Sequence, residues 1–348
     1  MPRFNVLRPL LTLAAVLLCG CSSLSYYAQL ADGQLSLLRA REPVADVIAD
    51  PARDPKLRER LRHAQAARDF ASRKLHLPDN RSYRLYADIH RPYVVWNVFA
   101  TDEFSLAPIT HCFPIAGCVA YRGYYSQGGA RGEAALQRQA GKDVYVSGVE
   151  AYSTLGWFDD PIISSMSAWG DDRLATLIFH ELAHQRFYVK DDTEFNESYA
   201  NFVEQEGTRQ WRTAQNLPPE SQAQARQRGQ FTQLVLEARE RLKQLYALPL
   251  SSAEMRARKA AEFERLRSAY RQLRAQQWGG DKRFDAWINA PLNNAKLLPF
   301  GLYDQWVPAF SAVFKQVNGD WPKFFAAVEK LGRLPIDERK AALQKLMP

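Results

Sequence analysis

The stretch HELAHQRFYVKDDTEFNES, His180 to Ser198, contains two histidines and several carboxylates within nineteen residues. Its pattern predicts two helices joined by an acidic turn, the first around Asp171–Val189 and the second starting near Asn196. His180 and His184 are four residues apart, so on a helix both imidazoles lie on one face, one turn apart. From that face both can bind a single metal ion.

Glu181 follows the first histidine, in the position from which a carboxylate can act on a metal-activated water instead of binding the metal. Leu174, Leu177 and Ile178 give the preceding turns an apolar face that would bury the helix. The motif fixes only three residues, and two histidines on a helix can also be ordinary core residues. The context favours a metal site, because the chain has only six histidines and a third candidate ligand follows.

That third ligand is predicted to be Glu197. Its neighbours Phe195, Tyr199 and Phe202 indicate a buried helix face. A carboxylate on such a face needs a partner, and a metal ion is one. Asp191–Asp192 follow the histidines too closely and are expected to form the acidic turn.

Asn201 lies one turn beyond the predicted ligand, from where its side chain could hydrogen-bond a ligating imidazole. Glu204 and Glu206 are expected to be solvated positions near the end of this helix.

Three ligands, His180, His184 and Glu197, leave the fourth position of a tetrahedral site open, which is typical of catalytic zinc. The sequence therefore predicts one Zn²⁺ per chain and a hydrolytic reaction. Glu181 would take a proton from a zinc-activated water and pass it to the leaving amine.

The chain begins MPRFNVLRPLLTLAAVLLCGCSSL. Arg3 and Arg8 precede an apolar run, Leu10 to Leu18, that is too short to span a bilayer. This layout is typical of a secretory signal.

The end of that run, Leu18 to Cys21, resembles the bacterial lipobox, in which the last cysteine is lipidated and becomes the new N-terminus. We therefore expect residues 1–20 to be a lipoprotein signal and Cys21 to carry the lipid anchor. Ser22 resembles the residue that sorts lipoproteins to the outer membrane, so we expect a periplasmic protein that is lipid-anchored to the outer membrane. A plain signal with an incidental Cys21 is the alternative.

The net charge of the 348 residues is +8. Loss of Arg3 and Arg8 with the signal leaves +6, spread along helices, which argues against nucleic-acid binding. Cys112 and Cys118, in HCFPIAGC, predict a short-loop disulfide in an oxidising compartment, with a pair of metal ligands as the alternative.

The predicted fold class is α+β, with a small β-sheet laid against a mostly helical body. Segments rich in Val, Tyr and Phe supply the strands, at residues 83–89, 93–101, 118–125 and 143–154. Helices are expected over residues 22–41 and 53–75, and a long charged antiparallel hairpin over 222–278. The expected division is a membrane-proximal helical segment 21–80, a catalytic core 81–215, and a helical C-terminal region 216–348.

HELAH followed by FNESYA resembles the gluzincin clan of zinc metallopeptidases, in which an Asn-Glu pair on the next helix supplies the third ligand. With CFPIAGCVAYRGYY, AYSTLGWFDDPI and the lipobox, the chain resembles a bacterial lipoprotein family described as putative aminopeptidases, most strongly from Cys112 to Gly207. The resemblance implies a zincin-like fold and peptide substrates. Two features differ: the twelve-residue gap between His184 and Glu197 is short, and Arg186 occupies a usually apolar place.

Residues 143–154, DVYVSGVEAYST, are placed like the edge strand on which zincins lay peptide substrates. Glu150 resembles in placement the carboxylate with which aminopeptidases hold the substrate's free amine; a solvated strand carboxylate is the alternative. Tyr303, and after it Tyr152, are candidate donors to the oxyanion.

Two other functions stay open. One is a zinc endopeptidase. The other is a non-catalytic lipoprotein with a structural zinc that uses residues 222–278 as an interaction surface. Glu181 argues against the second, because a structural zinc site has no need of a base.

Overall fold

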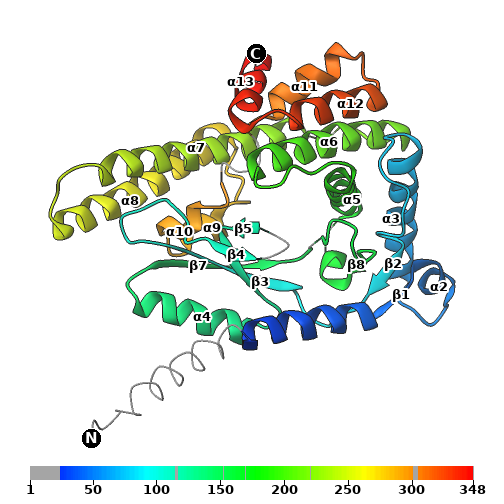
Figure 1. Cartoon of the computed structure of the whole chain (residues 1–348), viewed down its shortest axis with the longest axis horizontal. Helices are drawn as coiled ribbons and strands as arrows, with labels where there is room; N and C mark the ends of the chain where they lie inside the picture. The colour runs from blue at the N-terminus through cyan, green and yellow to red at the C-terminus, as the bar shows by residue number, and fades with distance from the viewer. Residues whose placement is uncertain are drawn as a thin grey trace, which may run out of the picture.

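The computed structural model describes residues 24–113, 117–151, 153–168, 170–219, 221–300 and 305–347. It confirms the α+β class: helices dominate, and three small sheets lie among them (Figure 1). No helix in these described ranges combines the length and apolar character needed to cross a membrane.

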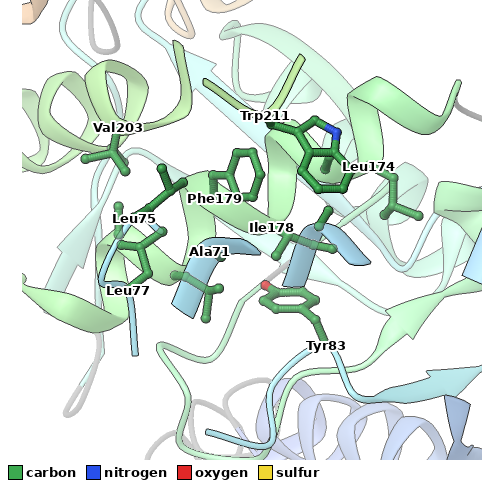
Figure 2. Packing of buried hydrophobic residues seen from close by; sticks show 14 of the residues in the cluster. Ala71, Leu75, Leu77, Tyr83, Leu174, Ile178, Phe179, Val203 and Trp211 are labelled. Atoms are coloured by element: carbon green, nitrogen blue, oxygen red, sulfur yellow. The ribbon is translucent and has the colours of Figure 1, made fainter. Parts of the chain in front are cut away.

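The centre of the molecule is a set of three helices, α3 (Pro55–Arg73), α5 (Asp171–Arg186) and α6 (Thr193–Ala214). They pack through apolar side chains at helical spacing, which places one stripe of each helix in a shared core. Figure 2 shows this packing, with Ile178 and Phe179 of α5 beside Ala71 of α3 and Trp211 of α6. The two helices expected around the histidine motif are therefore present and buried on one side.

The strands form three sheets where we expected one. The first sheet has the strand order β1 (Arg41–Pro43), β2 (Leu85–Ala87), β8 (Ile162–Ile163). The second has the order β6 (Tyr121–Tyr124), β3 (Val95–Thr101), β7 (Asp143–Val149). The third pairs β4 (His111–Phe113) with β5 (Gly117–Val119).

The separation of the first two sheets follows from the link between β2 and β3. His90 has a positive φ of 50°, and Pro92 cannot donate to a strand ladder. The extended run therefore stops, and β2 pairs with β1 and β8 instead of continuing beside β3. Among the described residues β7 pairs only with β3, so it is an edge strand. Cys112 and Cys118 lie opposite each other in β4 and β5 and form a disulfide.

The charged segment 222–278 folds as the antiparallel hairpin of α7 (Gln222–Tyr246) and α8 (Ser252–Gln277). Its facing sides carry a separate apolar cluster, in which Phe231 packs on Tyr270 and Phe284. Ser251 caps the start of α8 by accepting a hydrogen bond from the Glu254 amide.

The remaining helices surround this frame. They are the helix over residues 24–39, α2 (Val44–Ala49), α4 (Gln127–Gln139), the 3₁₀ turn η1 (Ser164–Ala168), α9 (Asp285–Asn289), α10 (Asn294–Leu297), α11 (Val307–Gln316), α12 (Trp321–Gly332) and α13 (Ile336–Leu346). The helix over 24–39 and α4 lie along the lower edge of Figure 1, opposite α11–α13. The aromatic C-terminal segment covers α6, with Phe310 and Phe324 against Tyr199.

Candidate metal centre

Helix α5 brings the two histidines to one side of the core. His180 Nε2 and His184 Nε2 are 3.1 Å apart, one helical turn separating the residues. The side chain of His180 is 13% exposed and that of His184 7%. Because the opposite stripe of α5 is fixed in the core by Ile178 and Leu182, the two imidazoles have little freedom to turn away.

The short turn between α5 and α6 is held by Asn196. Its Oδ1 accepts a hydrogen bond from the Val189 amide at 2.8 Å, and its Nδ2 donates to the Val189 carbonyl at 2.7 Å. Asp192 caps α6 by accepting from the Phe195 amide and pairs with Arg339 at 3.1 Å. The acidic turn is thus present. It reverses the chain so that Glu197, which follows Asn196, lies beside the two histidines.

Glu197 completes a compact group of three ligand atoms. Its Oε2 lies 3.4 Å from His180 Nε2 and 3.6 Å from His184 Nε2. A tetrahedral zinc with bonds of about 2.0–2.1 Å holds its ligand atoms about 3.3 Å apart. The spacing of the three atoms therefore fits zinc, and the three side chains form a group that could hold a metal ion.

Glu204 fixes the protonation of the first histidine. Its Oε2 lies 2.8 Å from His180 Nδ1. An ionised carboxylate only accepts, so Nδ1 carries the proton, and Nε2 of the neutral imidazole keeps its lone pair for a metal. Our expectation that Glu204 is a solvated position was wrong. It lies seven residues after Glu197, two turns along α6 and on the same face.

The carboxylates around the two histidines favour the binding of a cation. Glu181, Glu197 and Glu204 surround two imidazoles, which are neutral when they bind metal. Burial would raise the pKa of Glu197, but the hydrogen bonds of His180 and His184 outweigh burial and lower it to about 2. Burial would lower the pKa of His180, yet Glu197 and Glu204 raise it well above its usual value. Among these side chains alone, the carboxylates draw positive charge into the site, which a divalent ion would supply.

Glu181 projects from the same helix, one residue after the first histidine. Burial raises its pKa above the ordinary glutamate value, although His180 and His184 act in the opposite direction. A carboxylate with a raised pKa is a better proton acceptor than an exposed one. Glu181 is therefore suited to the role of base, beside the metal ligands and not among them.

A buried polar network near Glu181 was not predicted. Asp160, 2% exposed, accepts hydrogen bonds from Ser153 Oγ at 3.1 Å and from Thr154 Oγ1 at 2.6 Å. Gln185, one turn after Glu181, donates to Ser82 at 3.2 Å and accepts from Asn80 at 2.7 Å. This network holds the loop over 153–160 against α5.

Two tyrosines near the site were also missed. Burial, and after it the charge of Glu197, raises the pKa of Tyr121 on β6. Burial and then Glu197 likewise raise the pKa of Tyr188, whose ring centre lies 6.2 Å from that of His184. Tyr188 lies beyond the end of α5 at Arg186, so the extended chain after the helix, and not helical spacing, places its ring near His184.

The other predicted residues have varied outcomes. Glu150 directly follows β7, is partly buried and pairs with Arg173 of α5 at 3.4 Å. Asn201 was expected to hydrogen-bond a ligating imidazole; for His180 the partner is Glu204. The role of Asn201 stays a prediction. Tyr152, Tyr303 and Cys21 lie outside the described residues.

Arg186, which stands in a usually apolar place, has its own partners. Its guanidinium pairs with Glu329 of α12 at 2.9 Å and lies over the ring of Phe325. The C-terminal end of α5 is therefore joined to the aromatic cover of α6.

One family model matches almost the whole chain. It is described as putative aminopeptidase, and it matches residues 25–343. No curated protein and no solved structure matches the chain.

Proposed function

The chain belongs to the putative aminopeptidase family, and from this we propose that it is a zinc-dependent aminopeptidase. The observation that carries the proposal is the triangle of His180 Nε2, His184 Nε2 and Glu197 Oε2, with sides of 3.1, 3.4 and 3.6 Å. The carboxylate of Glu204 behind His180 supports it, because ligating histidines commonly donate their other N–H to a carboxylate.

A bound zinc supplies Lewis acidity at this site, which acidifies water and polarises the scissile carbonyl. The protein's part is to hold and move the proton. Glu181 accepts a proton from the attacking water and delivers it to the leaving amine. The network of Asp160 and Gln185 limits the movement of the loop beside Glu181.

The number of ligands favours a catalytic over a structural zinc. Structural zinc sites are closed by four protein ligands, whereas catalytic sites keep one position open. Among the described residues only three side chains, His180, His184 and Glu197, form the metal-binding group. Glu181 beside this group has no purpose in a structural site.

We place the peptide substrate along the outer edge of β7, beyond the start of the strand where Asn293 donates to the Val144 carbonyl. An extended peptide can add to such an edge through backbone hydrogen bonds, and β7 leads directly to Glu150. The aminopeptidase proposal assigns Glu150 to the substrate's α-amino group, whose positive charge it would bind.

One observation favours an endopeptidase instead. Glu150 pairs with Arg173 at 3.4 Å, so its charge already has a partner within the chain. An amine would have to displace or share that partner.

We further propose that the protein acts in the bacterial periplasm, held at the outer membrane by a lipid on Cys21. The support is the N-terminal sequence, with its apolar run ending in Leu18 to Cys21. The Cys112–Cys118 disulfide suits an oxidising compartment.

The deciding experiment measures zinc content and peptide hydrolysis together. The purified chain should contain about one zinc, release N-terminal residues from peptides with a free amine, and lose this activity on chelation. Re-addition of zinc should restore it. Stoichiometric zinc with no hydrolysis of free or acetylated peptides would overturn the enzyme proposal and leave a structural metal site.

A further inference from the structure

The first helix has an apolar face on the outside of the molecule. Its inner side packs against the rest of the protein. Tyr26 and Leu37 are only 7% and 3% exposed, and a Cβ at Gly33 would overlap the ring of Tyr125. On its other side Leu24 is 72% exposed, Tyr27 46% and Leu35 47%.

These exposed residues form one stripe. Leu24, Tyr27 and Leu35 follow the three-and-four spacing of a helix face, with the exposed Ala28 and Ala31 between them. The only charged residues in the sequence 24–39 are Asp32 and Arg39, and both fall beside the stripe. Single exposed apolar side chains are ordinary, but an uninterrupted exposed stripe marks an interaction surface. We call the residues Leu24, Tyr27, Ala28, Ala31 and Leu35 the outer stripe.

We propose that the outer stripe lies on a lipid bilayer, with the first helix parallel to the membrane plane. The inference rests on the proposed lipid anchor in one respect: Leu24 follows Cys21 by three residues, which span at most about 10 Å. An acyl chain on Cys21 would therefore hold the start of the stripe at the membrane surface.

The composition of the stripe fits this partner. In-plane helices bury an apolar face at the boundary between headgroups and acyl chains. Leu24 and Leu35 are separated by eleven residues, or about 16 Å of helix, so the two leucines provide two points of insertion. Tyr27 lies between them, and tyrosine is enriched at this depth because it has an apolar ring and a polar tip.

The arrangement of the fold gives the contact an orientation. The first helix and α4 lie along one edge of the molecule (Figure 1), and Tyr26 of the first helix belongs to the same buried apolar cluster as Ala130 and Ala134 of α4. Helices α11–α13 lie at the opposite edge. With the outer stripe on the bilayer, the C-terminal helices would face away from the membrane.

The test uses residues 21–348 produced without the signal segment and carrying Cys21→Ser, so that no lipid is attached, mixed with vesicles of phosphatidylethanolamine and phosphatidylglycerol. Flotation measures the bound fraction. The variant Leu24→Ser/Tyr27→Ser/Leu35→Ser should bind at least about tenfold less than the parent, because it removes most of the buried apolar area. A matched control is Leu248→Ser, since Leu248 is 45% exposed between α7 and α8, and it should bind like the parent.

A second variant guards against misfolding. Ala31→Glu keeps every large apolar residue and places one charge in the middle of the stripe; it should also bind about tenfold less. Parent protein that does not float, or stripe variants that float as well as the parent, would overturn the proposal. Concentration-dependent dimers of the parent that the stripe variants abolish would overturn it in favour of a second copy of the chain.

Zinc content and peptide hydrolysis in solution should be unchanged in both stripe variants. Failure of the parent to bind zinc or hydrolyse peptides would instead contradict the proposed enzyme function and leave the vesicle result unaffected.

Discussion

The Nδ1 atom of His180 lies 2.8 Å from the Oε2 atom of Glu204, across the interface of α5 and α6. The contact joins a candidate metal ligand to a carboxylate two turns beyond the third ligand, Glu197. It keeps the proton of His180 on the nitrogen that faces away from the metal group.

We therefore expect Glu204→Gln to weaken zinc binding by about 10- to 100-fold without abolishing it. A glutamine can still accept the hydrogen bond but lacks the negative charge. Competition with a fluorescent chelator measures the change. Glu206→Gln is the matched control, because Glu206 lies on the same helix and bonds to Arg209 instead. Equal zinc affinity in the Glu204 variant and the wild type would show that this carboxylate has no such role.

Removing a ligand should have a larger effect. His184→Ala removes one corner of the ligand triangle, leaving Glu197 and His180 as a two-residue site. The purified variant should contain less than about a tenth of the wild-type zinc, by elemental analysis, while its circular dichroism shows an intact fold. Full zinc content in a folded His184→Ala protein would place the metal elsewhere.

Much of this site could be predicted from sequence because its order is local. The spacing of His180 and His184 fixes their common face on any helix, and the aromatic neighbours of Glu197 indicate that its surroundings are buried. Glu204 was missed because we placed it near the end of its helix. In the structure α6 continues to Ala214, so Glu204 lies mid-helix, on the same face as Glu197.

The parts that sequence did not predict depend on distant contacts. Strand segments were recognisable from composition, and the break after β2 has a local cause at His90 and Pro92, but the strand that β2 pairs with instead, β8, lies more than seventy residues further along the chain. The contact between Asp160 and Gln185 could not be predicted for the same reason. Nothing in the sequence distinguishes either residue from other polar residues, and only the fold brings their side chains to 3.5 Å.

Glu181→Gln tests the base. The variant should keep its zinc, because Glu181 is not among the three ligand residues. Its kcat/KM should fall by about 10² to 10⁴, the usual contribution of a positioned base, since glutamine cannot accept a proton. Zinc analysis and hydrolysis are measured on the same preparation. Wild-type activity in this variant would assign the base to another residue.

Cys21→Ser tests the anchor. A hydroxyl does not replace the thiol that the lipobox modifies, so the variant should lose palmitate label and remain as an uncleaved precursor. Metabolic labelling and a mobility shift on gels report both effects. Cys19→Ser is the control, because Cys19 stands two residues earlier and should leave labelling intact. Undiminished label in the Cys21 variant would contradict the lipoprotein prediction.

Glu150→Ala tests whether the enzyme trims free N-termini. A free α-amino group is cationic at neutral pH, and a partly buried carboxylate would bind it much better than an acetylated end. Arg173 complicates this, since it pairs with Glu150 and would compete for the same oxygens. The Ala variant should therefore lose most of the wild type's preference for free over acetylated peptides, while its zinc content stays the same. Arg173→Ala serves as the matched variant: it removes the guanidinium that pairs with Glu150, so the preference for a free amine should rise. Equal cleavage of free and acetylated peptides by the wild type would make the enzyme an endopeptidase, and an unchanged preference in Glu150→Ala would move the amine site to another residue.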